Sequence, residues 1–526
     1  MTSGATDTAA TEGRPPPPKD WLPGLAENGK SDVVSGFIIF LIALPLCLAI
    51  AEASGAPPIA GIISGIVAGT LANLFSGSYI TINGPAAGMI VIVVGAVTEL
   101  GFAQALAVGV VAGGIQILLS FVKAGKLTGF FPLSVVHGML AGIGLIIMAG
   151  QIHIALGRPN PGEHGYHILT AIPPSFANPV PATALVGLAA VLVMIVWPML
   201  GSVSKVVPAP LVAVLVGTGI ALANGAGPTL DLGGGLLAGF TGPDFSGILS
   251  GPAIKWIVLY VFVASLESLL TAEAVDKLDP YKRRSNMNRE LFGKGVGNMV
   301  SSGIGGLPMI AEVVRSKANI LTGARTRWSN FFHGVFLALF VLAAPGALEL
   351  IPNAALAGVL LVVGFKLAHP NDFRHALHVG KVDFVLMLVT AFAVLFTDLL
   401  IGVATGIVLG LVYAVVRGTS LGNLFKAKMT VTEQGEAIRI VFRGALGFHN
   451  FIKIRSTLDE LPPAKTVTLD FSAVHYVDPT VMERLHDFEV AYTTDGGTVV
   501  RVGDERLQAD GHHEFATRTA PKQAVA

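Results

Sequence analysis

About fourteen apolar runs occupy the chain between residues 33 and 416. Runs of about 17 to 25 apolar residues are long enough to cross a bilayer as helices. The whole sequence is 52% hydrophobic and only 13% charged, whereas soluble domains carry about 25% charge. We therefore predict a polytopic helical membrane protein, with runs near 33–52, 57–75, 86–98, 104–122, 131–150, 182–200, 207–224, 253–275, 290–303, 309–321, 329–346, 350–367, 382–398 and 400–416.

Lysine and arginine placement predicts the orientation of these spans, because short cytoplasmic loops retain positive charge. With the N-terminus inside, the loops expected in the cytoplasm contain most of these residues, and the expected external loop 225–252 has none. Arg158 and Lys255 are the exceptions. The pattern favours fourteen spans in the plasma membrane with both termini cytoplasmic; the cytoplasmic basic residues are Lys123, Lys126, Lys205, Lys277, Lys282, Arg283, Arg284, Arg289, Arg325, Arg327, Lys366, Arg374, Lys381 and Arg417.

Two of the apolar runs are too short to cross alone, and both follow glycine and proline. The third run comes after Gly84 and Pro85, and the tenth comes after the stretch Gly303 to Pro308. Interrupted segments at matching positions in two halves indicate a 7+7 inverted repeat with its binding site between them. The β-branched residues before Gly84 predict an extended strand, tolerated at membrane depth only where protein surrounds it. The alternative is that glycine and proline simply kink two ordinary spans.

The tenth run contains charged residues that are costly at membrane depth and are therefore functional candidates. We expect its helix to begin at Met309 and to direct free N–H groups into the interior, where an anion can bind. Arg315 would balance that anion, or would form a structural ion pair with Glu267 or Glu312. Glu312 opposes anion binding unless it is protonated, paired or directed away, and it could titrate together with Glu267.

The eighth run supplies the candidate for ion coupling. Glu267 and Thr271 are four residues apart and lie on one helix face. Burial disfavours the charged form of a carboxyl group, so Glu267 could take up and release a proton. Alternatively, the carboxylate and hydroxyl oxygens of Glu267 and Thr271 would ligate a sodium ion. The remaining interpretation is an interhelical hydrogen bond without a role in transport.

The ends of the chain differ from the membrane portion. Residues 1–30 are predicted to be a disordered cytoplasmic arm, residues 31–418 the transporter domain, and residues 508–526 a flexible tail. Between them, residues 428–507 alternate strand-like and helix-like segments, which indicates a small α/β domain. The formal net charge is zero and favours no nucleic-acid partner. Phosphate-loop, dinucleotide and zinc-ligand motifs are absent, which argues against an enzyme and predicts no cofactor.

Several spaced motifs resemble the SulP family of sulfate permeases, which is related to prestin. The motifs cover nearly the whole membrane portion, and the tail resembles a STAS domain, the usual cytoplasmic appendage of the family. They are Asp32…Gly36…Leu44-Pro45, Gly84-Pro85, Pro132…Gly138…Gly142-Ile143-Gly144, Asn288-Arg289-Glu290-Leu291…Gly293…Gly297-Asn298 and Pro308…Arg315-Ser316…Asn319…Gly323-Ala324-Arg325-Thr326.

The resemblance implies a core domain of spans one to four and eight to eleven, a gate domain of the other six, and an elevator-like movement. It implies that an anion binds between the third and tenth helix starts and that the protein is a homodimer. Glu267 occupies the acidic position linked to proton or sodium coupling, with Thr271 as a cation ligand and Glu312 as a further coupling candidate. The predicted anion-binding residues are Leu46, Ile50, Ala86, Ala87, Met309, Ile310, Ala311, Val314 and Arg315.

The resulting hypothesis is a secondary transporter of inorganic oxyanions, sulfate or bicarbonate, driven by co-transport of a proton or sodium. A first alternative keeps the architecture but carries organic solutes such as dicarboxylates or nucleobases. A second is an anion channel or sensor that signals to a cytoplasmic partner through the STAS-like domain. Thr480, in the stretch Asp478-Pro479-Thr480, is a candidate phosphorylation switch in that domain.

Overall fold

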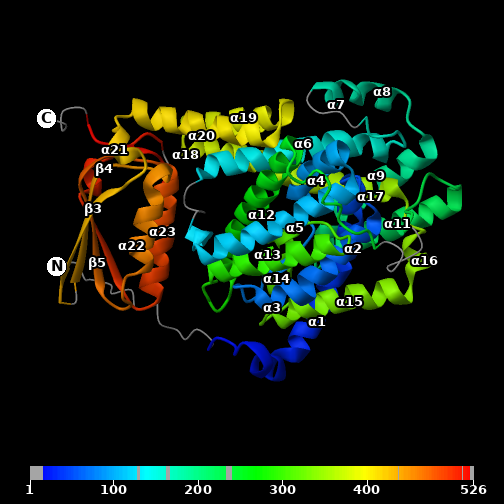
Figure 1. Cartoon of the computed structure of the whole chain (residues 1–526), viewed down its shortest axis with the longest axis horizontal. Helices are drawn as coiled ribbons and strands as arrows, with labels where there is room; N and C mark the ends of the chain where they lie inside the picture. The colour runs from blue at the N-terminus through cyan, green and yellow to red at the C-terminus, as the bar shows by residue number, and fades with distance from the viewer. Residues whose placement is uncertain are drawn as a thin grey trace. The chain divides into compact units, whose positions relative to one another are not determined.

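The computed structural model describes residues 16–126, 131–161, 166–232, 240–435, 437–511 and 513–521. The chain forms two compact units (Figure 1). The first unit takes its described residues from 1–125, 155–157 and 180–360. The second unit takes its described residues from 126–154, 158–179 and 361–526.

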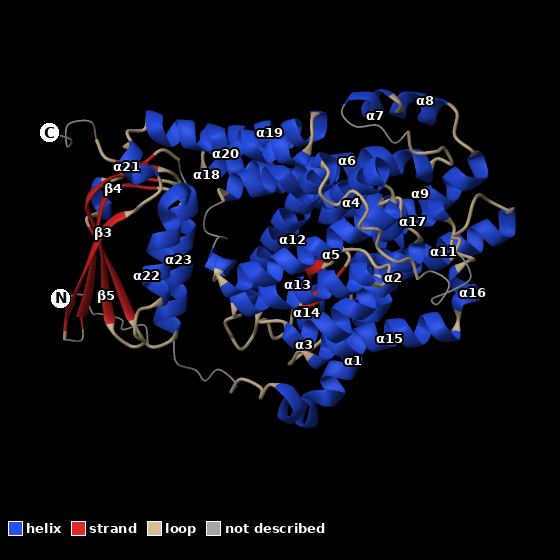
Figure 2. Ribbon diagram, viewed as in Figure 1, coloured by secondary structure: helices blue, strands red, loops and turns tan. Residues whose placement is uncertain are grey.

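The first unit is helical except for one small pair of strands (Figure 2). Its elements are α1 (Trp21–Ala53), α2 (Pro58–Val67), the π-helical turn η1 (Ala68–Ala72), α3 (Asn73–Phe75), β1 (Ile82–Gly84), α4 (Ala87–Leu100), α5 (Phe102–Phe121), α9 (Pro181–Val196), the 3-10 turn η3 (Trp197–Leu200), α10 (Ser202–Val206), α11 (Ala209–Asn224), α12 (Gly251–Leu278), α13 (Met287–Gly303), β2 (Ile310–Glu312), α14 (Val313–Leu321), α15 (Trp328–Ala343), α16 (Pro345–Leu348) and the first part of α17 (Asn353–Leu367).

The second unit joins further apolar helices to a mixed α/β domain. Its elements are α6 (Leu133–Ala155), α7 (Tyr166–Thr170), α8 (Ile172–Ala177), the end of α17, α18 (Pro370–Val379), α19 (Lys381–Phe396), α20 (Leu399–Val416), α21 (Leu421–Leu424), β3 (Lys428–Gln434), β4 (Ala437–Leu446), the 3-10 turn η4 (Phe448–Asn450), α22 (Phe451–Asp459), β5 (Thr466–Val477), α23 (Pro479–Thr494), β6 (Thr498–Val502), the 3-10 turn η5 (Asp504–Arg506), β7 (Gln508–Ala509) and β8 (Arg518–Thr519).

Helices lie in all fourteen apolar runs, although the tenth run begins with the strand β2. Within the described part of the chain, eight helices are long and apolar enough to cross a membrane, and three shorter apolar helices accompany them. The third and tenth runs form α4 and α14, which begin only after the strands β1 and β2. The sequence prediction of two shortened helices is therefore confirmed, whereas the number of spans and the internal repeat stay predictions.

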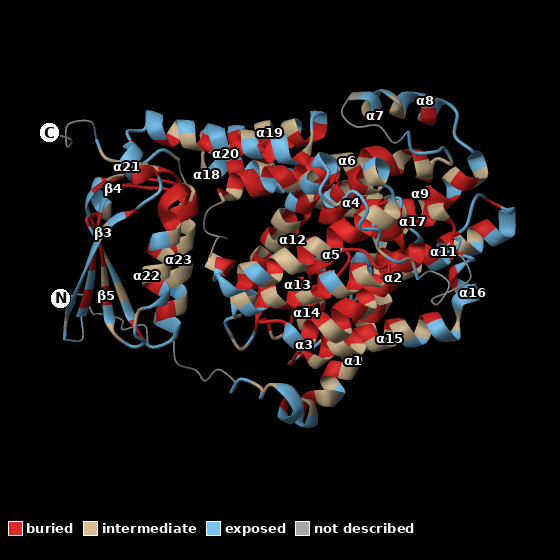
Figure 3. Ribbon diagram, in the orientation of Figure 1, coloured by how far each residue is buried: buried red, intermediate tan, exposed pale blue. Residues whose placement is uncertain are grey.

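Close backbone approach at glycine shapes the interior of the first unit. A Cβ on Gly113 of α5 would lie 2.5 Å from the backbone nitrogen of Met299 in α13. A Cβ on Gly295 would likewise lie 2.7 Å from the carbonyl oxygen of Gly113. Small residues let membrane helices pack with their backbones close together. Residues 43–51 of α1 and nearly all of α2 are buried, whereas α5 is buried over part of its surface (Figure 3).

The α/β domain of the second unit is built on one mixed sheet. β3 pairs antiparallel with β4, which pairs parallel with β5. β6 pairs parallel with the beginning of β5, and β8 pairs antiparallel with its end. The alternation of buried and exposed residues along β4 is the period-two pattern that places one face of a sheet on a core. α22 and α23 lie together on one side of the sheet (Figure 2).

Three expectations about the ends and the gate differ from the structure. Residues 21–30, predicted to be disordered, continue α1 towards its N-terminus, and residues 1–15 lie outside the described part. An ion pair anchors this end, because Asp20 accepts from Arg327 at 2.7 Å. Part of the tail that was predicted to be flexible from residue 508 forms the strands β7 and β8. β8 pairs with β5 and β7 pairs with β8, so both belong to the sheet.

The predicted gate helices do not form one compact unit. α9 and α11 lie in the first unit, whereas α6, α19 and α20 lie in the second. α11 packs on α1 and α9, and a Cβ on Gly217 of α11 would lie 2.6 Å from the Cβ of Ala355. The packing of α11 on α1 explains why α11 lies in the first unit with core helices.

Candidate anion-binding site

The centre of the first unit is a two-stranded antiparallel ribbon. β1 and β2 pair Ile82 with Glu312, Asn83 with Ala311, and Gly84 with Ile310. The ribbon is buried apart from Glu312, which is only partly exposed. Each strand is followed directly by a helix, because α4 begins at Ala87 and α14 begins at Val313. The β-branched stretch before Gly84 thus forms the extended strand predicted from the sequence.

The pairing places the two helix starts at opposite ends of the ribbon. α4 follows Gly84 at one end, whereas α14 follows Glu312, which pairs with Ile82 at the other end. The N-termini of α4 and α14 therefore converge on the ribbon from opposite sides, with free N–H groups and positive dipole ends. Such a convergence of helix N-termini is suited to holding an anion.

The predicted helix start at Met309 is wrong. Residues 310–312 form β2, and the helix begins at Val313. The backbone of these residues pairs with β1, and the N–H of Met309 donates to Oδ1 of Asn298 at 2.6 Å. Their polar groups are thus satisfied without a helix. Arg315 consequently lies in the first turn of α14 rather than one and a half turns along it.

Arg315 is fully buried and forms an ion pair within its own segment. Its Nη2 lies 3.1 Å from Oε1 of Glu312, and its Nε donates to Oε2 of Glu312 at 3.2 Å. Nη2 also donates to the carbonyl oxygen of Pro85, and Nη1 lies 3.9 Å from Sγ of Cys47. The guanidinium thus connects α14 to the β1–α4 turn and to α1. Of the two carboxylates predicted as partners of Arg315, Glu312 forms the ion pair.

A glycine makes room for the guanidinium on the ribbon. A Cβ on Gly84 would lie 2.6 Å from Nη1 of Arg315. Any larger residue at position 84 would therefore displace the guanidinium. The glycine is required here by close approach rather than by its backbone angles.

Glu267 of α12 reaches the first turn of α4. A Cβ on Gly88 would collide with both carboxylate oxygens of Glu267, so the carboxyl group lies directly over this glycine. Its Oε1 is buried and has no hydrogen-bond partner among the described residues. Thr271, one turn further along α12, is also buried. The structure thus brings Glu267 to the start of α4, whereas Arg315 lies on Gly84 before that start.

Hydroxyl groups hold the ribbon to the surrounding helices. Oγ of Ser316 accepts from the N–H of Ile82 at 2.8 Å, and Oγ of Ser268 accepts from the N–H of Ala311 at 3.2 Å. Ser268 follows Glu267 on α12, and Ser316 follows Arg315 on α14. Each charged candidate is therefore next to a residue that fixes the ribbon.

Most of the other predicted anion-site residues are buried close to these elements. Leu46 and Ile50 lie on α1 on either side of Cys47, which contacts Arg315. Val314 is the exception, since it is 62% exposed. The buried members are Leu46, Ile50, Ala86, Ala87, Met309, Ile310, Ala311 and Arg315. Their contact with an anion stays a prediction.

Sequence reasoning missed a second ion pair against the ribbon. Lys294 and Glu290 of α13 form this pair, and both side chains are completely buried. Lys294 also donates to Oδ1 of Asn83 in β1 at 2.7 Å. A signal was present, because a glutamate and a lysine four residues apart on a helix are neighbours. The sequence prediction treats Glu290 only as part of a family motif.

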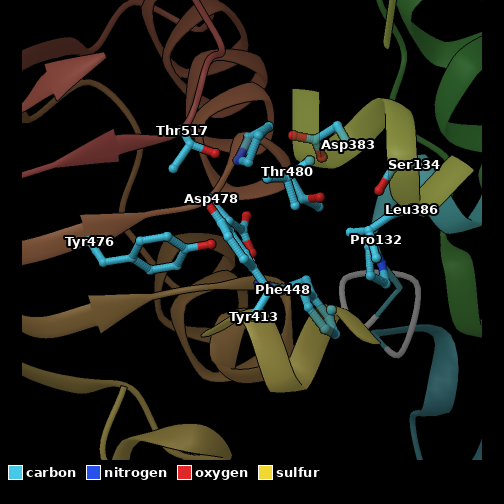
Figure 4. A pocket seen from close by; sticks show the side chains of 13 residues that line it. Pro132, Ser134, Asp383, Leu386, Tyr413, Phe448, Tyr476, Asp478, Thr480 and Thr517 are labelled. Atoms are coloured by element: carbon cyan, nitrogen blue, oxygen red, sulfur yellow. The ribbon is translucent and has the colours of Figure 1, made fainter. Parts of the chain in front are cut away.

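A second polar centre lies entirely within the second unit. It is a cavity of about 20 Å³, which is room for about one water molecule. Asp383 of α19 and Asp478, the N-cap of α23, both line it together with Thr480 (Figure 4). Burial raises the pKa of Asp478 to about 7, although the N–H groups of Val481 and Phe448 lower it.

Thr480 is buried in this contact. Its Oγ1 accepts from the N–H of Leu133, the first residue of α6, at 3.3 Å. It is 4% exposed, so its hydroxyl group is not presented to solvent in this conformation. Its predicted role as a phosphorylation switch stays a prediction.

Residues 30–390 match the sulfate permease family. The chain belongs to this family. It is 29% identical over 495 residues to the putative sulfate transporter YvdB of Bacillus subtilis strain 168, covering 90% of this chain and 91% of the relative. Members of the sulfate permease family are transporters rather than enzymes, and the SulP resemblance seen in the sequence is confirmed.

Solved structures share the fold. The transmembrane domain of a cyanobacterial bicarbonate transporter, BicA, has a TM-score of 0.64 and 28% identity, covering 72% of this chain and 97% of that one. The murine solute carrier 26 family member A9 has a TM-score of 0.63 and 15% identity, covering 90% of this chain and 85% of that one. The membrane portion therefore has a multi-pass transporter fold, and the C-terminal sheet is consistent with a STAS domain.

Proposed function

We propose that this protein is a secondary active transporter of inorganic oxyanions, sulfate or bicarbonate, coupled to co-transport of a proton or sodium. The observation that carries the proposal is the convergence of α4 and α14 on the β1–β2 ribbon, with the carboxyl group of Glu267 over Gly88. Relatives that cover most of this chain include a putative sulfate transporter and a bicarbonate transporter.

The helix starts supply the attraction for the anion. Arg315 and Glu312 form a pair, and an ion pair whose charges cancel exerts only a weak field beyond its immediate surroundings. The amide N–H groups at the starts of α4 and α14 then provide the main positive potential. An oxyanion with several acceptor oxygens suits such a site, because it can accept from both helix starts at once.

Glu267 couples the anion to a cation. A buried, ionised carboxylate without a partner is costly, so this group is expected to bind a proton or a cation. When it does so, its charge no longer repels the anion at the start of α4. Anion binding and cation binding then favour each other by the same coupling free energy. Thr271 would add a hydroxyl oxygen if the cation is sodium.

Movement and assembly complete the proposal. Binding between two half-helices supports an elevator-type cycle, in which the first-unit site moves relative to the other helices. We expect a homodimer in the plasma membrane with both termini in the cytoplasm. The C-terminal α/β domain would serve as a STAS-type contact for a cytoplasmic partner.

Uptake into proteoliposomes tests this function. Purified protein is reconstituted, and uptake of labelled sulfate and bicarbonate is measured under separately imposed pH and sodium gradients. Accumulation driven by one gradient supports the proposal. Competition by fumarate or uracil against the labelled sulfate and bicarbonate would favour an organic solute. A current far larger than a cycling carrier can pass would favour a channel.

Glu267→Gln tests the coupling role. Because glutamine cannot take up a proton and carries no charge, uptake by this variant should no longer respond to the gradient that drives the wild type. Glu99→Gln is the matched control, since Glu99 lies at the other end of α4 and pairs with Lys255 at 2.9 Å. A Glu267→Gln protein that accumulates anion with the full gradient dependence of the wild type would refute the assignment.

A further inference from the structure

The ribbon contacts a second buried cation that the transport proposal does not use. Gly84 faces Arg315, and side chains alternate along a strand, so Asn83 lies on the other face of the ribbon. There Oδ1 of Asn83 accepts from Nζ of Lys294 at 2.7 Å. Lys294 and Arg315, both completely buried, thus lie on opposite faces of one short ribbon.

One oxygen of the carboxylate beside Lys294 has three donors other than the lysine. One oxygen of Glu290 accepts from Oγ of Ser76, from the N–H of Gly77 at 3.0 Å and from the N–H of Ser78 at 3.1 Å. These neutral donors fix the loop before β1, but they leave the full negative charge of Glu290 in the interior, and its other oxygen accepts from Nζ of Lys294. Lys294 is the cation that cancels this charge.

Asn83 adds an unsatisfied donor at the same place. A lysine ammonium can only donate, so the amide oxygen of Asn83 must face Lys294. The Nδ2 group of Asn83 is then buried without a hydrogen-bond partner among the described residues. Buried polar groups are normally satisfied. On this face of the ribbon, however, hydrogen-bond donors outnumber acceptors, and an excess of donors favours a negative charge nearby.

We propose that Lys294 determines the affinity of the transporter for its anion. It cancels the charge of Glu290 next to the ribbon and holds β1, and hence the start of α4, through Asn83. Lys294 is a positioning and electrostatic residue here and does not contact the anion. The inference rests on the proposed function, because it assumes that the anion binds at the ends of this ribbon.

Charge variants of the pair separate this role from a purely structural one. Lys294→Gln leaves Glu290 uncompensated, so the KM for anion uptake should rise. Glu290→Gln leaves the charge of Lys294 uncompensated, so KM should fall. The amide oxygen of the glutamine can still accept from the loop before β1. A unit charge within about 10 Å of a bound anion changes its affinity by roughly tenfold at the effective dielectric constant of proteins. A structural role predicts impaired uptake in both variants.

The experiment measures initial rates of sulfate and bicarbonate uptake in proteoliposomes for the wild type and three variants. These are Lys294→Gln, Glu290→Gln and the double variant, in which the net charge is again that of the wild type. We expect KM shifts of opposite sign in the single variants, with kcat changed less than KM. In the double variant, KM should return to within about threefold of the wild type. Size-exclusion profiles and thermal unfolding establish that each variant is folded.

Each outcome decides the proposal. If KM moves in the same direction in both single variants, or in neither, Lys294 is only structural and the inference is wrong. If Lys294→Gln is not recovered as folded protein, the fall in KM of Glu290→Gln decides alone. Wild-type protein that takes up neither anion would overturn the proposed function together with this inference. Wild-type uptake with unshifted variants would overturn this inference only.

Discussion

The two polar centres of this protein hold their charged side chains in different ways. At the ribbon of the first unit, buried charges are paired with each other or lie over glycines, as Arg315 does with Glu312 and Glu267 does over Gly88. At the cavity of the second unit, Asp478 is instead held by the backbone N–H groups of Val481 and Phe448, as a helix cap.

Under the proposed function, the ribbon is the centre whose charge changes during the transport cycle. A capping carboxylate is fixed by backbone donors that cannot move without unfolding the helix start. A carboxylate over a glycine has no such donor, and its unpartnered oxygen leaves it ready to bind a proton or an ion. We therefore expect changes at the ribbon to alter transport strongly, and changes at the cavity to alter stability with little effect on transport.

Arg315→Gln should have the largest effect. The substitution leaves Glu312 as an uncompensated charge in the interior, and breaking a buried pair costs about 3–5 kcal/mol. The rate of anion uptake should fall by roughly a hundredfold or more. Initial uptake rates at saturating anion, normalised to reconstituted protein, measure this loss.

The double variant Arg315→Gln with Glu312→Gln sharpens that result. Both charges are removed, so the desolvation penalty of an unpaired group is absent and folding should recover. If uptake stays low in this folded protein, the charge of Arg315 serves the anion. Full recovery of uptake would show that the pair is structural, which is the alternative left open by the sequence.

Gly88→Ala should have the next largest effect. The added Cβ would occupy the place of the Glu267 carboxyl group. This neighbour is the end of a flexible side chain, so we expect the protein to fold with Glu267 displaced. Uptake should fall by about tenfold with weaker dependence on the driving gradient, as a misplaced coupling group costs one to two orders of magnitude.

Gly114→Ala on α5 is the matched control for Gly88→Ala. A Cβ at Gly114 would meet no atom within 4 Å. The same gain in helix propensity therefore occurs without a collision. Uptake by the control should equal that of the wild type. Equal uptake by Gly88→Ala would contradict the placement of Glu267 at the start of α4.

The sequence predicted the elements of both units well, because their signals are local. Apolar length located the helices, and the alternation of strand-like and helix-like segments indicated the α/β domain that contains β3 to β6. The start of α14 was misplaced because only a partner strand distant in sequence, Ile82–Gly84, makes residues 310–312 extended. The strands β7 and β8 were missed for the same reason, since β8 depends on the end of β5.

The candidate site was predicted in its residue types but not in its contacts. Buried charges in apolar runs singled out Glu267, Glu312 and Arg315. That Arg315 pairs with Glu312 rather than Glu267 depends on where α14 begins, which the local sequence does not determine. The contact of Lys294 with the ribbon was not predicted, because its partner Asn83 lies in β1, in the other half of the membrane portion.

Asp478→Asn should change the pH dependence of stability. Because burial raises the pKa of Asp478 to about 7 from 3.8, the folded state binds its proton more tightly than the unfolded state. Asp478 therefore stabilises the fold fully below about pH 4, and this contribution is lost as pH rises through about 7. The variant should lose this slope. Thermal unfolding of the detergent-solubilised protein at several pH values between about 4 and 8 measures it.

The asparagine variant also tests the comparison of the two centres. Asparagine still accepts from the N–H of Val481, so at about pH 4 we expect the variant to be only about 1–2 kcal/mol less stable than the wild type. This difference should shrink as pH rises, because only the wild type loses the contribution of Asp478. Anion uptake at neutral pH should stay within about twofold of the wild type. A loss of uptake as large as that of Gly88→Ala would show that the cavity acts in the transport cycle.

Thr480→Val should have the smallest effect. Valine keeps the shape of threonine but cannot accept from the N–H of Leu133, and an unmade hydrogen bond of this kind costs about 1–3 kcal/mol. The unfolding midpoint should fall by a few degrees with uptake unchanged. Thr494→Val, at the exposed end of the same helix, is the matched control and should not lower the midpoint. If Thr480→Val instead alters uptake without altering stability, then Thr480 regulates transport, and the second polar centre is a control point rather than a structural cap.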